Sequence, residues 1–168
     1  MKLLKIKISR RPELVTGIHV KEGSNWIIIQ ENPVDYILDG YTIINKVFIK
    51  SIIEPFEKDS FEYKIFDLKY RAMSVDLIFD LDTDKALISF FERTDKLIGL
   101  ELESDDYTLV GKVSKVNDKS FLFKMIGTKG QFLREENLKF SSIRKVDIDT
   151  DYLQSLENYL KEYPDVLV

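Results

Sequence analysis

Thr16-Gly17-Ile18-His19-Val20-Lys21-Glu22 recurs about 80 residues later as Ile98-Gly99-Leu100-Glu101-Leu102-Glu103-Ser104. Each copy leads through a polar turn to an aromatic residue, Trp26 or Tyr107, that opens another apolar run. A second echo relates Phe48-Ile49-Lys50-Ser51-Ile52 to Ser142-Ile143-Arg144-Lys145-Val146. Because this period is too long for a solenoid unit, it predicts two similar β modules in tandem.

Apolar and polar residues alternate in both halves of the chain, which is typical of half-buried strands. Short turns rich in Gly, Asn, Asp and Pro separate these stretches. The pattern predicts strands at 4–8, 15–21, 26–29, 36–38, 41–44 and 47–53 in the first half, and at 98–104, 108–116, 121–126, 132–134 and 142–148 in the second.

Three segments have helical spacing. The first spans 56–70, and the second follows Thr83, whose side chain is expected to cap a helix ending near Asp95. The third follows Thr150, with Leu153, Leu156, Tyr159 and Leu160 on one face and Pro164 as its end. The only linker-like segment is 71–82, in which 75–79 reads as a short strand or extended chain. We therefore expect modules at 1–72 and 73–168.

The second half also contains a motif that resembles a known fold. Gly111-Lys112-Val113-Ser114-Lys115-Val116-Asn117-Asp118 follows the order of the first Sm motif, with a glycine in a bent second strand, then apolar residues, then an acidic or amide turn. A helix followed by five strands is the order of an Sm-like small barrel. The resemblance implies a mainly β fold with a few helices: two tandem five-stranded Sm-like or SH3-like barrels with connecting and C-terminal helices. Residues 35–41 are also similar to uncharacterised bacterial proteins of the tandem-barrel type.

The residues that would bind RNA in an Sm protein are only partly present. Phe121 stands where RNA-binding Sm proteins usually have an asparagine, and Leu133-Arg134-Glu135 lacks the glycine of their Arg-Gly pair. The resemblance therefore favours the barrel over the RNA pocket.

The composition restricts the possible functions. The chain has 168 residues, 44% of them hydrophobic and 32% charged, and its net charge is -4. An acidic balance disfavours non-specific binding to phosphate backbones and suits a basic partner. The absence of cysteine excludes disulfides and thiolate chemistry and fits a reducing compartment. Lysines interrupt the apolar residues of 1–8, so no signal peptide is predicted and we expect a cytoplasmic protein.

Acidic residues are densest at Asp76, Asp80, Asp82 and Asp84, and the last three begin like a calcium-binding loop. Such a loop needs glycine at its sixth position and glutamate at its twelfth, where this chain has Lys85 and Phe91. We expect these carboxylates to flank the start of a helix, where negative charge favours the dipole.

No catalytic or cofactor-binding motif stands out. His19 is the only histidine, is expected at the surface, and has no partners at the spacing of a nucleophile or base. Gly127 and Gly130 lack the lysine of a phosphate loop and predict a hairpin turn. The spacing of the 29 acidic residues singles out no pair as catalytic. We therefore expect no enzyme activity, metal or cofactor.

Two groups of residues are candidates for binding. The second half is rich in lysine, with Phe121, Phe123 and Phe132 nearby, which would suit nucleic acid. Alternation along the strands instead favours lysines towards solvent and phenylalanines in the core. In the first half, most of the aromatic residues are expected in the core, but so short a module cannot easily bury all of them, which predicts an exposed patch as a partner surface: Trp26, Tyr36, Tyr41 and Phe48.

These observations favour a non-enzymatic protein that binds another protein. One form is an immunity or accessory protein that covers a basic toxin or nuclease. The alternative is RNA binding by the more basic second module. We expect a monomer or dimer, and the sequence does not locate the binding surface.

Overall fold

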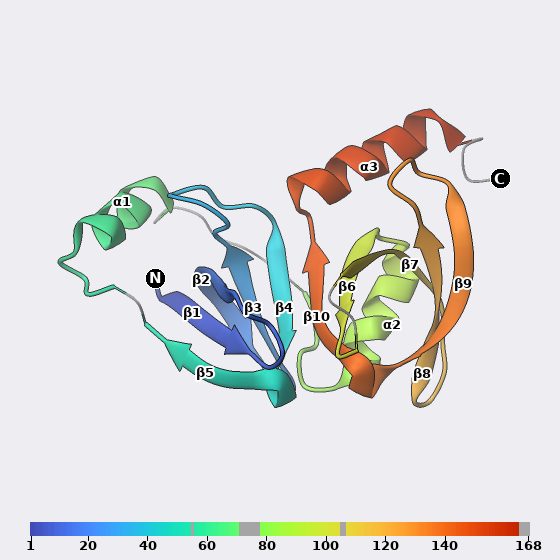
Figure 1. Cartoon of the computed structure of the whole chain (residues 1–168), viewed down its shortest axis with the longest axis horizontal. Helices are drawn as coiled ribbons and strands as arrows, with labels where there is room; N and C mark the ends of the chain where they lie inside the picture. The colour runs from blue at the N-terminus through green and yellow to red at the C-terminus, as the bar shows by residue number, and fades with distance from the viewer. Residues whose placement is uncertain (55, 71–77, 105–106, 165–168) are drawn as a thin grey trace.

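The computed structural model describes residues 1–54, 56–70, 78–104 and 107–164, and the described chain is mainly β with three α-helices (Figure 1). The strands are β1 (Leu3–Ile8), β2 (Leu14–Glu22), β3 (Trp26–Glu31), β4 (Tyr41–Asn45), β5 (Ile49–Ile53), β6 (Ile98–Leu102), β7 (Thr108–Val116), β8 (Ser120–Ile126), β9 (Phe132–Lys139) and β10 (Ile143–Ile148). The helices are α1 (Phe61–Tyr70), α2 (Asp84–Thr94) and α3 (Asp151–Glu162), with short 3-10 turns η1 (Lys46–Phe48) and η2 (Phe140–Ser142).

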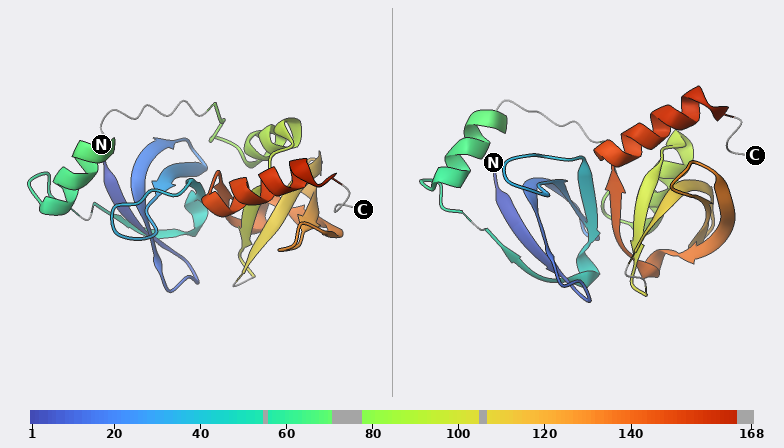
Figure 2. Two further views of the ribbon diagram at one scale, coloured as in Figure 1. Left: turned by 90° about the horizontal axis from the view of Figure 1, so that it is seen from above. Right: turned by 45° about the horizontal axis from the view of Figure 1, so that its top comes forward.

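All ten strands belong to one antiparallel sheet in the order β5-β1-β2-β3-β4-β10-β6-β7-β8-β9. The expectation of two separately closed barrels is therefore not met. β4 pairs with β10, so that Ile43 lies opposite Val146 and Thr42 opposite Asp147. Figures 1 and 2 show the two halves side by side with this pair of strands between them. An exposed edge strand can pair with another strand, and here each half supplies such a partner to the other.

The two halves repeat the same strand order, because β10-β6-β7-β8-β9 matches β5-β1-β2-β3-β4 position by position. A 3-10 turn joins the fourth strand to the fifth in each half. The second strand of each half carries a bulge, between His19 and Lys21 in β2 and between Val113 and Lys115 in β7. The second echo in the sequence follows this repeat, since Ile49 and Ile143 begin the two fifth strands.

The first echo is out of register by one strand. Gly17 lies in β2, but Gly99 lies in β6, which is the first strand of the second half. The structural counterpart of Gly17 is Gly111 in β7, since both precede the bulge by two residues. A Cβ atom on Gly17 would lie 2.1 Å from the Gln30 carbonyl oxygen, and one on Gly111 would lie 2.2 Å from that of Lys124. Both glycines thus allow the same close approach of two strands.

The central strands β3 and β4 are buried on both faces. Trp26, Ile28 and Ile43 join a core that contains α2 and side chains of β6, β7, β8 and β10. Ile27, Ile29 and Ile44 point into a second core, shared with β1 and β2. This is why residues 26–29 are an unbroken apolar run and do not alternate.

Several helices and strands begin or end at residues other than those predicted from the sequence. No strand forms at 36–38, because residues 35 and 36 form a turn closed by a single bridge between Val34 and Ile37. The first helix begins at Phe61 and not at 56, while β9 continues five residues beyond 134 to Lys139. Residues 71–77, which hold most of the predicted linker and the boundary between the proposed modules, lie outside the described residues.

The capped helices are confirmed. The Thr83 hydroxyl accepts a hydrogen bond from the Ala86 amide at the start of α2, and Thr150 accepts one from Leu153 at the start of α3. α3 lies over a small third core in which its three buried leucines contact Leu97 and Ile126. Within the described residues, no helix is both long enough and apolar enough to cross a membrane.

Candidate protein-binding groove

The four aromatic residues considered for a partner surface in the first half are mostly covered, which confirms that most of them belong to the core. Trp26 and Phe48 are buried, and Tyr41 packs against the larger core. Tyr36 is partly buried and meets the Phe66 ring edge-on, with centroids 5.7 Å apart. The predicted partner surface there is wrong, because the sequence did not reveal that Trp26 is buried by the other half of the sheet.

Exposed rings gather instead on the second half, mainly along α3. Tyr152 is 49% exposed, Tyr159 42% and Tyr163 55%. The rings of Tyr159 and Tyr163 lie 5.0 Å apart. Tyr159, which the sequence placed on the buried face of this helix, lies beside that face, because the leucine stripe alone fills the contact with the sheet.

A groove runs between α3 and the sheet beneath it. Its first hollow, of about 460 Å³, is lined by Thr128, Lys129, Tyr152, Ser155, Leu156 and Tyr159. A second hollow of about 350 Å³ shares Thr128 and Tyr152 with the first and continues to Tyr107, Met125 and Leu133. We call these two adjoining hollows the tyrosine groove.

The β8–β9 turn forms one wall of the tyrosine groove. The Gly127 carbonyl accepts a hydrogen bond from the Gly130 amide, which confirms the predicted hairpin turn. Gly130 has a φ of 82°, a left-handed conformation that glycine adopts without strain. A Cβ on Gly130 would lie 3.0 Å from Leu160 Cδ2 and 3.2 Å from Tyr159 Cε1, so the turn sits directly against α3.

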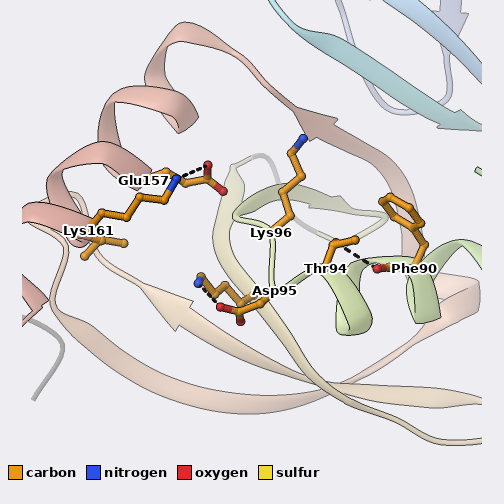
Figure 3. A pocket seen from close by; sticks show the side chains of 8 residues that line it. Phe90, Thr94, Asp95, Lys96, Glu157 and Lys161 are labelled. Atoms are coloured by element: carbon orange, nitrogen blue, oxygen red, sulfur yellow. Dashed lines mark hydrogen bonds and ion pairs between the residues drawn. The ribbon is translucent and has the colours of Figure 1, made fainter. Parts of the chain in front are cut away.

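A separate, charged hollow of about 550 Å³ lies between α2, α3 and β7 (Figure 3). Lys112 Nζ is 2.6 Å from Asp95 Oδ2, and Lys161 is 4.0 Å from Glu157. Glu157 also accepts a hydrogen bond from the Leu97 amide at 2.8 Å. The third lysine of the hollow, Lys96, is 2.7 Å from Asp149 outside it, so each lysine has a carboxylate partner and the hollow offers little net attraction for a charged ligand.

A second charged cluster crosses the junction of β4, β10 and β6. Glu101 is buried and lies 2.6 Å from Arg11 Nη1 and 2.8 Å from Arg144 Nε. Lys145 is 2.7 Å from Asp147, which also accepts a hydrogen bond from Thr42 in β4. Because Arg11 and Thr42 belong to the first half, this cluster ties the two halves together and fixes how β4 and β10 align.

The acidic residues at the start of α2 are structural, as expected, while Asp76 lies outside the described residues. Asp82 accepts hydrogen bonds from the amide and hydroxyl of Ser24, which lower the pKa of its carboxyl group. Asp84 accepts hydrogen bonds from Asn25 and from the Trp26 indole. The carboxylates therefore join the helix to the β2–β3 turn. Within the described residues, no three His, Asp or Glu side chains form a group able to hold a metal ion.

His19 is half-buried in β2, deeper than predicted from its position in the strand. Its Nε2 lies 4.0 Å from a Glu22 carboxylate oxygen. Burial lowers the pKa of the imidazole, while Glu22 partly opposes this shift.

The aromatic residues considered for nucleic-acid binding divide into two groups. Phe121 and Phe123 are fully buried, and Phe121 stacks on Phe140 inside the core. Phe132 is 39% exposed, and the Lys124 ammonium lies 5.0 Å from its ring centre. Arg134 is exposed on β9 and forms an ion pair with Glu136.

Comparison with known protein families, with characterised proteins and with solved structures found no match for this chain. The assignment of the tyrosine groove as a binding site therefore depends on its geometry alone. One signal in the sequence does point to it: Tyr152, Tyr159 and Tyr163 are spaced by seven and four residues, which places them on one side of a helix.

Proposed function

We propose that this protein binds another protein through the tyrosine groove and has no catalytic role. The observation that carries the proposal is the concentration of exposed tyrosines around two connected, largely apolar hollows. Tyrosine is enriched among residues that dominate binding energy, because its ring buries apolar area while its hydroxyl group can form hydrogen bonds. The partner would insert apolar side chains on both sides of Tyr152.

Charge favours a protein over RNA as the occupant. Among the described residues that line the groove, the only charged side chain is Lys129. A nucleic-acid site of this size would need several cations to neutralise phosphates. RNA binding stays the alternative proposal and would use Lys124, Phe132 and Arg134 near β9 instead, since burial removes Phe121 as a base-stacking residue.

The acidic net charge of -4 supports a basic partner, as for an immunity or accessory protein that covers a toxin or nuclease. The proposed compartment is the cytoplasm, which a sequence without cysteine would suit.

We further propose that residues 1–72 and 73–168 are two modules related to Sm-like or SH3-like small barrels, opened and joined edge to edge. The shared strand order, the equivalent glycines Gly17 and Gly111, the equivalent bulges and the 3-10 turns support this relationship. In this arrangement, α3 and the tyrosine groove belong to the second module.

A capture experiment with matched variants tests the proposed function. The immobilised wild-type protein is expected to retain a stoichiometric protein partner from native lysate at moderate salt. The double variant Tyr152→Ala/Tyr159→Ala should lose that partner, because truncating central aromatic residues typically costs at least about 2 kcal/mol each in binding. Phe61→Ala, an exposed aromatic change on α1, is the control and should retain it.

Three results would contradict the proposal: no stoichiometric partner for the wild type, equal retention by the groove variant, or loss of the partner with Phe61→Ala. A filter-binding titration with RNA separates the alternative. Retention of RNA at low salt that Arg134→Ala weakens and the groove variant leaves unchanged would favour the β9 surface.

A further inference from the structure

The two ends of the sheet are strands β5 and β9, and they differ in how they are protected. β9 carries charged side chains at four of its eight positions: Arg134, Glu135, Glu136 and Lys139. Charged residues on an edge strand discourage pairing with another chain. β5 has the sequence Ile-Lys-Ser-Ile-Ile, with one charge and no proline.

Apolar side chains of β5 are exposed. Ile52 is 45% exposed and Ile53 52%, although both belong to a strand. Ile52 lies opposite Ile6 of β1. The side chain of Ile6 is fully buried in the second core, which β1 and β2 share with β3 and β4. Side chains opposite each other share a face of the sheet. Ile52 is therefore at the open rim of that core, where a further strand would cover it.

We propose that β5 pairs antiparallel with β5 of a second copy of this chain, forming a two-fold symmetric dimer with one sheet continuous across both copies. The inference is independent of the tyrosine groove, which lies in the other half of the chain. It also fits the construction of the chain itself, because β10, the equivalent of β5 in the second half, is paired on both sides.

Charge complementarity between the two copies of β5 selects the register of their pairing. A two-fold axis places one residue opposite its own copy, so the candidates centre on Ser51, Ile52 or Ile53. Centring on Ile52 places Lys50 opposite Glu54 of the other copy, twice in the dimer, and Ile52 against Ile52. Centring on Ile53 would instead place Ile52 opposite the charged Glu54, and centring on Ser51 would place Lys50 opposite Ile52. Opposite charges in facing positions stabilise antiparallel pairs.

Lys50 and Glu54 are free to take these roles. Both are exposed, and the ion pair that Glu54 forms within the described residues is a long one, 3.8 Å from the ammonium of Lys2. Lys50 is the extra residue of a bulge between β5 and β1, and its long side chain can still reach a facing carboxylate. Pairing β5 with β9 of another copy would instead set Glu54 against Glu135 if it followed the β4–β10 register, which disfavours a head-to-tail chain.

Charge reversal tests the dimer in the full-length protein. Sedimentation velocity across a concentration series should show wild type in monomer–dimer equilibrium. Lys50→Glu and Glu54→Lys should each weaken dimerisation by about tenfold or more, because each creates two facing pairs of like charge. The double variant Lys50→Glu/Glu54→Lys should restore it. Glu135→Lys on β9 is the matched control and should leave the dimer unchanged.

Circular dichroism on each variant verifies that the fold is retained, and the exposed positions of these residues make that the expected result. A wild type that stays monomeric throughout the series would overturn the proposal. So would single reversals that leave dimerisation unchanged, or a double variant that does not recover it. Open-ended polymers whose growth responds to Glu135→Lys would indicate head-to-tail assembly instead.

Discussion

Gly17 and Gly111 have the same structural role in the two halves, and we expect substitution of either one to destabilise the protein. Alanine at either position would force its Cβ to within 2.1–2.2 Å of a backbone carbonyl oxygen on the neighbouring strand. Backbone cannot move aside as a side chain can, so we expect each change to reduce the free energy of unfolding by about 1–3 kcal/mol or more. Urea denaturation measures the loss.

Gly99→Ala is the control for this prediction. Its added Cβ would meet the Thr108 side chain, at 2.9 Å, and no backbone atom lies as close. A side-chain rotation can relieve that contact, so the loss should be smaller. An equal loss at Gly99 would contradict the explanation based on backbone approach.

Glu101 balances buried positive charge at the junction of the halves. In Glu101→Gln, Arg144, whose side chain is 3% exposed, would lose the carboxylate 2.8 Å from its Nε. We expect the free energy of unfolding to fall by about 3–5 kcal/mol, because the buried guanidinium is left without that charge. Glu103→Gln changes an exposed pair with Arg10 and should cost less than about 1 kcal/mol in the same urea titration. Similar losses for the two variants would mean that the buried cluster contributes no more than the surface pair.

His19 should make stability depend on pH. Burial lowers the imidazole pKa in the folded protein below the ordinary value of 6.5, so the unfolded chain binds the proton more readily. The free energy of unfolding should therefore fall as pH decreases through about 6.5 towards the folded pKa, and change little from this residue above about pH 7.5. In urea titrations at successive pH values, His19→Asn should show a shallower fall. Identical slopes for the two proteins would rule out His19 as the cause.

At the scale of elements, α3 is attached by its cap and by one leucine stripe. The Thr150 hydroxyl accepts a hydrogen bond from the Leu153 amide. Leu153, Leu156 and Leu160 are buried beneath the helix. Thr150→Ala should lower the free energy of unfolding by about 1 kcal/mol. Thr150→Ser keeps the hydroxyl and is the control in thermal unfolding followed by circular dichroism. If serine is as destabilising as alanine, the capping hydrogen bond is not the reason.

Most elements could be predicted from local pattern. Alternating apolar residues located the majority of the strands, and Thr83 and Thr150 located two helix starts. The prediction of a strand at 36–38 was wrong because residues 35 and 36 form a turn held by Asn32. The Asn32 side-chain amide donates a hydrogen bond to the carbonyl of Ile37. The tyrosine groove was missed because Tyr159 fits the spacing of the apolar face of α3. Only the packing shows that the leucines alone fill that face.

At the scale of the whole molecule, the arrangement of the halves was not predictable from the same patterns. Alternation reports which face of a strand is buried, but it does not say which strand lies beyond an edge. The unbroken run 26–29 did carry information, since burial on both faces requires structure on both sides. The pairing of β4 with β10 brings the second half of the chain against one face of this strand. The buried Trp26 lies where the first half packs against the second.

The central claim is that the two halves share one sheet through β4 and β10. Backbone NOEs measured by NMR between residues 41–44 and 145–148 test it most directly. We predict an antiparallel series that includes the facing pairs Ile43–Val146 and Thr42–Asp147, with slow amide exchange along both strands. The absence of these NOEs, with amides of β4 and β10 exchanging as fast as those of an unpaired edge, would contradict the account.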